Sequence, residues 1–342
     1  MPILEPESHE VEEAAFYCFK QGGERHGYAH KDWLQGKHLV FLAKNYDLIA
    51  RHTLKSDAKE YIWQQIPRRC RYCGAVKPDT AEWKVAHALP ALVGNKTIIA
   101  MDECTTCNET FGALENDLGN MLQLSRAIVR IEGNNGVPCF PAPKGKSRID
   151  VTGDKIEIKQ YADDPLSKLD TTNSTINLTG KSSPLTPLAV YKSLTKMALA
   201  VMPPAYLQMF AHTIDWIKNK NHTLGAADVA ASAMCRFTFQ PGPMPPDYGH
   251  CTLLLRKSPD ALVPYMLFVL TMANQTFQIM VPCTPRDNNL VGHKIAMPEY
   301  PAYYGIGYEY GEPTGTTLDL TSPNKVRIPI SGSLTGDEIK VT

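Results

Sequence analysis

The chain has no excess charge of either sign. Its 342 residues carry 35 Lys and Arg against 35 Asp and Glu, so the formal net charge is zero. The protein as a whole therefore has no field that draws it to nucleic acid or to an acidic membrane, and a polyanion would have to be held by local basic patches. Charged residues make up 20% and hydrophobic residues 43% of the chain, which is typical of a soluble globular protein with one large or two ordinary domains.

The sequence also lacks a hydrophobic run that could cross a bilayer. The uncharged stretch 261–285 holds an apolar run, Leu262–Met272, which is about half of the roughly 20 residues that a transmembrane helix needs. Residues 1–14 are acidic and have no apolar core, which argues against a signal peptide. We therefore expect no membrane contact, a cytoplasmic location, and a buried element of the core at 261–285.

The cysteine count argues against a full disulfide framework, because the chain has nine cysteines, an odd number. The single ones are Cys18, Cys139, Cys235, Cys251 and Cys283. The other four form two Cys-x-x-Cys pairs, Cys70 with Cys73 and Cys104 with Cys107. This usage is typical of a reducing compartment with one metal site.

The spacing of the two pairs predicts a structural zinc site. A gap of two residues lets one tight turn point both sulfurs at the same ion, and Gly74 after the first pair permits that turn to close. Two such pairs bring four thiolates to one Zn²⁺, which prefers tetrahedral sulfur ligands. Four thiolates leave the ion no open position, so we expect it to stabilise the fold and not to act as the catalyst.

The residues between and after the pairs resemble a known family. The stretch "AHALPALVGN" contains His87, Gly94 and Asn95, and "DECTTCNETFG" places Asn108 directly after the last cysteine. Together they resemble the HNH endonuclease superfamily, in the branch whose modules read His-x-x-Pro, Gly-Asn and Cys-x-x-Cys-Asn. The resemblance covers roughly residues 68–122.

The resemblance implies a ββα-metal, treble-clef-like module. Its strands are expected near Trp83–Ala88 and Ile98–Met101, and its helix from Thr105. Apolar residues recur at spacings of three and four over 105–128, which predicts the same helix independently.

The resemblance also implies roles for three residues. His87 is similar to the family's general base, Asn95 to the residue that fixes the histidine tautomer or tethers the loop, and Asn108 to a ligand of a catalytic Mg²⁺ or Mn²⁺. The residues alone leave other interpretations open. A lone histidine is usually a satisfied or exposed residue, Asn95 after a glycine is equally a turn residue, and Asn108 could cap the helix.

One position departs from the family pattern. Many HNH nucleases have Asp or Glu directly before the histidine as a metal ligand, whereas this chain has Ala86. Asp102, Glu103 and Glu115 are candidates to replace that carboxylate. Glu115 follows Asn108 by two helical turns, about 10 Å along the axis, so sharing one ion is doubtful. Glu115 could equally be a surface carboxylate or one that stands behind the metal ligands, and Asp102 or Glu103 could equally neutralise basic neighbours.

Basic residues near the first cysteine pair are candidate contacts for substrate phosphates. They are Arg68, Arg69 and Arg71, with Lys84, Arg126 and Arg130 as neighbours in sequence and Lys144–Arg148, Lys192 and Lys196 as weaker candidates. A solvated surface is the alternative for each of them.

Composition and periodicity divide the α+β chain into three parts. Residues 1–66 are expected to be helical, with two helices in Val11–Val40 and another over Tyr46–Ile66. Residues 67–135 are the HNH module that the resemblance implies, and the Gly- and Pro-rich stretch Glu132–Lys146 indicates a linker or exposed loop. Residues 148–342 are predicted to be a mixed α+β domain with a core of its own. In that part we expect strands at Arg148–Ile158, 174–178, 251–256, 276–281, 303–310 and 325–330, and a helix over Pro187–Lys218 broken at Met202–Pro204.

The sequence therefore favours a metal-dependent HNH endonuclease that hydrolyses phosphodiester bonds in DNA, with structural zinc and catalytic Mg²⁺ or Mn²⁺. The expected biological role is that of a bacterial defence or restriction-type effector. Such a protein could act with a sensor or regulatory subunit, or as an oligomer. Two alternatives remain open: a non-catalytic zinc module that binds nucleic acid or protein, and an RNA-directed toxin nuclease.

Overall fold

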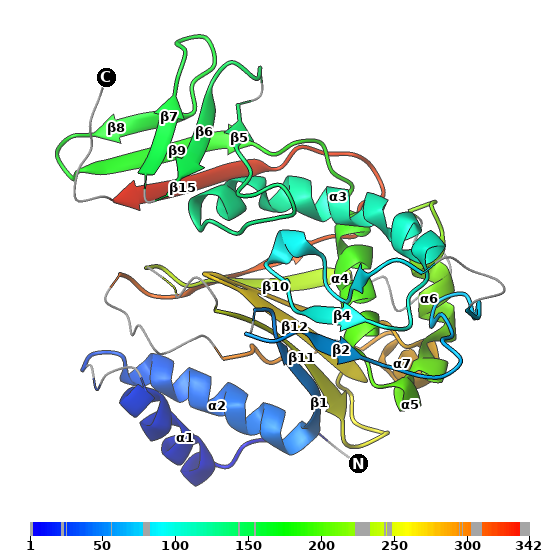
Figure 1. Cartoon of the computed structure of the whole chain (residues 1–342). Coiled ribbons are helices and arrows are strands. Elements are labelled where there is room, and N and C mark those ends of the chain that lie inside the picture. Colours follow the sequence, from blue (N-terminus) through cyan, green and yellow to red (C-terminus); the bar gives the residue numbers. More distant parts are fainter. Residues whose placement is uncertain are drawn as a thin grey trace.

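The computed structural model is mixed α+β, with helices and several antiparallel sheets (Figure 1). It describes the chain except residues 1–2, 22–23, 25, 56, 78–82, 143, 154, 223–232, 243, 245–247, 294, 296, 302–309 and 336–342. Within the part of the chain that the structure describes, no helix has both the length and the apolar character of a transmembrane span.

The α-helices are α1 (Ser8–Gln21), α2 (Ala29–Asn45), α3 (Thr105–Ile128), α4 (Pro187–Val201), α5 (Pro204–Leu207), α6 (Ala211–Lys218) and α7 (Thr284–Asp287). The strands before α4 are β1 (Tyr46–Thr53), β2 (Glu60–Ile62), β3 (Ala86–His87), β4 (Ile98–Ala100), β5 (Phe140–Pro141), β6 (Arg148–Thr152), β7 (Lys155–Lys159), β8 (Ser167–Asp170) and β9 (Thr175–Lys181). The later strands are β10 (Met234–Phe239), β11 (Gly249–Arg256), β12 (Met266–Met272), β13 (Gln275–Met280), β14 (Thr314–Asp319) and β15 (Pro329–Thr335).

The largest sheet has six strands in the order β1-β11-β12-β13-β10-β14. Strand β12 is buried along its whole length and pairs with β11 and β13 on either side. The prediction of a buried element at 261–285 is thereby confirmed, since a strand covered on both faces reads as one continuous apolar run.

The helix predicted over Tyr46–Ile66 is wrong. Residues 46–53 form β1, which pairs antiparallel with β11 from Tyr46 opposite Arg256 to Thr53 opposite His250. Residues 60–62 form β2, which runs parallel to β4. The spacing of apolar residues in 46–66 is compatible with a helix. Residues 46–53 form a strand instead because they pair with β11, which lies far along the chain and which local spacing does not indicate.

Most other predicted elements occur. Helices α1 and α2 lie in the predicted region around a turn, and the predicted break at Met202–Pro204 separates α4 from α5. Strands also form in 148–158, at 175–181, in 249–256 and in 275–280. The predicted linker 132–146 contains the short strand β5, which pairs with β6. The strand expected at 303–310 falls almost wholly outside the described residues.

The expectation of a separate C-terminal core is wrong. One buried hydrophobic cluster includes Phe111 and Leu118 of α3, Leu194 of α4 and Phe268 of β12. Helix α3 packs against α4, and Figure 1 shows α4 beginning next to α3. The predicted segment boundaries at 66–67, 135 and 148 remain predictions, but the cysteine region and the C-terminal half share one core.

The three-stranded sheets β15-β9-β8 and β5-β6-β7 lie on the side of α3 that faces away from the large sheet (Figure 1). Their buried residues Phe140, Ile149 and Leu178 pack against Leu124 and Ala127 near the end of the helix. Helix α3 therefore contacts core residues along both its first and last turns.

Candidate metal centre and its surroundings

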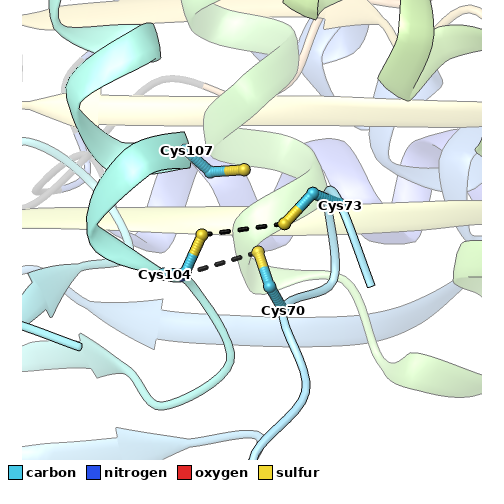
Figure 2. A group of neighbouring side chains, drawn as sticks. All are labelled: Cys70, Cys73, Cys104 and Cys107. Atoms are coloured by element: carbon cyan, nitrogen blue, oxygen red, sulfur yellow. Dashed lines mark hydrogen bonds between the residues drawn. The ribbon is translucent and has the colours of Figure 1, made fainter. Parts of the chain in front are cut away.

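The four paired cysteines converge at the beginning of α3 (Figure 2). The sulfurs of Cys70, Cys73, Cys104 and Cys107 all lie within 4.8 Å of one another, and those of Cys73 and Cys104 are 3.7 Å apart. Sulfurs at about 2.3 Å from a tetrahedral zinc ion are separated by about 3.8 Å. The cluster therefore has the dimensions of a four-cysteine zinc site, and within the described part of the chain it is the only group of three or more metal-ligating side chains.

Local backbone geometry brings the sulfurs together. Gly74 adopts a left-handed φ of +75° and donates its N–H to the Cys70 carbonyl at 2.8 Å, while the Cys70 N–H bonds to the Ala75 carbonyl at 2.8 Å. Cys104 is the N-cap of α3, and Cys107 lies in its first turn. Thiolates at a helix N-terminus are stabilised by the positive end of the helix dipole.

The proton chemistry of the four thiols also favours a cation. A hydrogen bond from Cys107 lowers the pKa of Cys70 to about 4, whereas burial raises the pKa of Cys104 to about 11. The hydrogen bond to Cys70 raises the pKa of Cys107 above its ordinary value. The protein alone thus favours the protonated thiols of Cys104 and Cys107, and a divalent ion at the centre of the cluster would allow both to ionise.

His87 lies on β3, one residue after the buried Ala86. It is opposite Ile99 of β4, the strand that leads to Cys104 and α3. The side chain is half-buried. Its pKa is lowered from the ordinary histidine value, first by burial and then by the positive charges of Lys59 and Lys196. The imidazole is therefore held in its neutral form near pH 7, the form that accepts a proton.

Asn95 ties the β3–β4 loop together and is completely buried. Its side-chain nitrogen donates to the carbonyls of Leu89 at 2.7 Å and Ile98 at 3.1 Å. Its side-chain oxygen accepts from the N–H groups of Thr97 at 3.1 Å and Ile98 at 2.9 Å. The amide group is fully used in the loop, so Asn95 positions the loop that follows His87.

Replacing Asn95 with alanine should destabilise the protein by about 2–4 kcal/mol, because buried backbone groups lose partners worth about 1 kcal/mol each. Denaturant unfolding measures this loss. Asn116→Ala, on the exposed face of α3, is the control and should change stability by less than about 0.5 kcal/mol. Equal small effects of both substitutions would contradict the assignment.

Asn108 lies in the first turn of α3, where its N–H bonds to the Cys104 carbonyl at 3.0 Å. The helix cap is Cys104 and not Asn108. Across the described ranges, the Asn108 side-chain amide makes no hydrogen bond to the protein. Asn108 is half-buried, and no hydrogen bond within that part of the chain uses its amide oxygen.

Asp102, the first candidate replacement for the carboxylate missing at Ala86, is paired with Arg71. Asp102 Oδ2 lies 2.7 Å from Arg71 Nη2 and 2.8 Å from Nε. Arg71 also donates to backbone carbonyls at the end of α4, those of Leu199, Ala200 and Met202. The Arg71 guanidinium is buried and bonded inside the protein, so it joins the first cysteine pair to α4 and does not face a substrate phosphate.

Glu103 and Glu115, the other two candidates, face the ammonium group of Lys196. Lys196 Nζ lies 3.1 Å from Glu103 Oε2 and 4.0 Å from Glu115 Oε1. Burial raises the pKa of both carboxyl groups, and the lysine charge opposes that rise. One cation from the C-terminal half of the chain thus already lies beside both carboxyl groups.

Sequence reasoning missed this role of Lys196, which it counted as a weak phosphate contact. The side chain is almost wholly buried, and its ammonium group also lies 5.7 Å from the centre of the Phe111 ring. A lysine inside the apolar helix α4 is the one signal that could have indicated a buried partner, since lysine is rarely buried without one.

The remaining candidate phosphate contacts near the first cysteine pair differ in exposure. Arg69 and Lys84 are exposed. Arg68 is half-buried, donates to the Met101 carbonyl at 2.7 Å and stacks at 4.6 Å over the Trp83 ring. Arg126 is buried. The exposed positive side chains near the cysteine cluster are therefore those of Arg69 and Lys84, and the Lys84 ammonium group lies 3.9 Å from Glu109 Oε1.

Comparison of the chain with protein-family models, with curated proteins and with solved structures found no match. The likeness to HNH endonucleases therefore rests on the motif residues described above and on no whole-chain relationship.

Proposed function

We propose that the protein is a metal-dependent HNH-type endonuclease that hydrolyses phosphodiester bonds in DNA. The observation that carries this proposal is the position of His87. This half-buried imidazole, kept neutral by its surroundings, lies on a strand that pairs with the strand leading to the cysteine cluster and α3. The order of strand, strand and helix around the cluster agrees with the motif residues.

In this proposal His87 takes a proton from the attacking water. Asn95 holds the loop that follows it, and Asn108 offers an amide oxygen to a divalent ion. Bound Mg²⁺ or Mn²⁺ would stabilise the charge that develops on the phosphoryl group and assist the departing 3′ oxygen. Mg²⁺ commonly keeps several water ligands and binds substrate phosphates directly, which suits a site where the nearby carboxylates already face Lys196 and Arg71.

The same carboxylate contacts favour a second candidate, a non-catalytic zinc module that binds nucleic acid or protein. Asp102 and Glu103 are both buried and both paired with cations. If Asn108 alone is too weak to hold an ion, the centre has structural zinc and no catalytic metal. Mg²⁺-dependent cleavage of a plasmid by the zinc-loaded protein separates the two candidates.

The exposed side chains of Arg69 and Lys84 would hold backbone phosphates. We propose that the protein acts in the cytoplasm as a defence or restriction-type effector, alone or with a sensor subunit. Parallel assays with duplex DNA and RNA of the same sequence test the substrate. Faster cleavage of RNA would favour the toxin-nuclease alternative.

The proposal predicts how cleavage depends on pH. A base works in its deprotonated form, so the rate should rise as pH passes upward through the pKa of His87 and then level off. Because burial and two lysines lower that pKa, the midpoint of the rise should lie below the value of about 6.5 that describes an unperturbed imidazole. Single-turnover rates between pH 5 and 8 measure this. A midpoint above about 7 would contradict the assignment.

Replacing Asn108 with alanine should weaken binding of the catalytic ion while leaving zinc in place. We expect the Mg²⁺ concentration needed for half-maximal cleavage to rise at least ten-fold, with partial recovery in Mn²⁺. Metal titrations of the cleavage rate, with zinc content measured in parallel, check this. Unchanged Mg²⁺ dependence would remove Asn108 from the site.

A further inference from the structure

A row of three side chains crosses the small sheet that carries His87. The strand order of this sheet is β2-β4-β3, so β4 is the central strand and β2 and β3 are its edges. Tyr61 of β2 and His87 of β3 both lie opposite Ile99 of β4. Opposite residues project to the same face of a sheet, and adjacent strands are about 4.8 Å apart, so the backbones at Tyr61 and His87 are separated by about 10 Å.

The face with Tyr61 and His87 is not the one that packs into the core. Successive residues of a strand point to opposite faces. Ile98 and Ala100, on either side of Ile99, belong to the buried hydrophobic cluster that is shared with α3 and α4. Tyr61, by contrast, is 49% exposed. The tyrosine ring is therefore open to solvent on the same face of the sheet as the imidazole.

The charge on this side of β2 is positive. Lys59, two residues before Tyr61, is exposed. Its charge reaches His87, whose pKa is lowered first by burial and then by this lysine. Glu60 points to the opposite face, where its Oε1 lies 2.8 Å from Nδ1 of His52. An exposed aromatic ring beside a lysine is the combination that binds single-stranded nucleic acid, because a base stacks on the ring and a backbone phosphate meets the cation.

We propose that this face binds a single strand of DNA, with one base stacked on the Tyr61 ring and a backbone phosphate beside Lys59. Bases in a duplex are stacked on one another, so a protein ring reaches the face of a base only where the base is unpaired. Tyr61 and His87 are close enough for one strand to contact both. The inference rests on the proposed function of His87 and narrows its substrate to unpaired DNA.

The test measures binding of a short fluorescent single strand of DNA, and of the duplex of the same sequence, to the zinc-loaded full chain by fluorescence anisotropy without added Mg²⁺. Tyr61→Ala should weaken single-strand binding about ten-fold, the effect of losing one stacked base, and should leave duplex binding unchanged. Tyr61→Phe keeps the ring and should bind like the parent. Lys59→Gln should make the log–log dependence of affinity on salt shallower by about 0.7, the value for one lost phosphate contact.

The matched control is Tyr161→Ala, which removes a tyrosine that is 57% exposed outside this sheet and should leave both affinities at the parental value. Absence of single-strand binding, equal binding by Tyr61→Ala and the parent, or an equal loss in Tyr61→Phe would overturn the proposal.

These measurements do not need cleavage, so this inference and the nuclease proposal can fail separately. If the parent cleaves DNA through His87 but Tyr61→Ala binds the single strand normally, only the Tyr61 site is lost. If Tyr61→Ala loses single-strand binding and the parent never cleaves, the Tyr61 site stands and the nuclease proposal is lost.

Discussion

Replacing Cys104 with serine should remove zinc and unfold the protein well beyond the cysteine cluster. A structural zinc ion contributes on the order of 10 kcal/mol to folding, whereas a native domain is stable by only about 5–15 kcal/mol. Cys70, Cys104 and Cys107 belong to the same buried cluster as α4 and the large sheet. The loss should therefore spread into the C-terminal half and not stop at the end of α3.

Zinc content by elemental analysis and circular dichroism during heating measure the two parts of this prediction. Cys139→Ser, which changes an exposed single cysteine, is the matched control and should keep one zinc per chain and the original unfolding midpoint. A folded Cys104→Ser protein without zinc would show that the cluster is not a structural metal site.

Replacing His87 with alanine should slow DNA cleavage by about 10²- to 10⁴-fold, the usual contribution of a general base. In free energy this is about 3–5 kcal/mol of barrier height. The substitution leaves the cysteine sulfurs and the Asn95 bonds in place, because neither contacts the imidazole through a hydrogen bond in the described structure. Zinc content and DNA affinity should change little.

Single-turnover cleavage under saturating Mg²⁺ measures the effect, with gel-shift titrations for affinity. His212→Ala, at an exposed position of α6, should cleave at the parental rate. A His87→Ala variant that cleaves as fast as the parent would remove His87 from the mechanism and favour the zinc-module alternative.

The cysteine cluster could be predicted from the sequence because its information is local. Each pair depends on one turn, and Gly74 with its positive φ closes the first of them. The helix that carries Cys107 has a clear apolar periodicity over 105–128, and it begins at the predicted residue. A site that depends on residues close together in the sequence can be predicted without knowing how distant parts of the chain pack.

Contacts between distant segments could not be predicted in this way. Residues 46–53 form a strand because β11, about 200 residues further along, pairs with them. Lys196 faces Glu103 because α4 packs against α3, and Arg71 reaches the end of the same helix. The sequence alone predicts a helix for 46–53 and phosphate contacts for Lys196 and Arg71. Its local pattern carries no information on which distant residues pack against them.

The most direct test of the nuclease proposal is a cleavage assay on supercoiled plasmid with zinc-loaded protein. We expect nicked or linear product when Mg²⁺ or Mn²⁺ is added, none without added metal, and about 10²-fold less or lower with His87→Ala. A plasmid that is bound but stays supercoiled at every Mg²⁺ and Mn²⁺ concentration would contradict the proposal and leave a zinc-stabilised binding protein in its place.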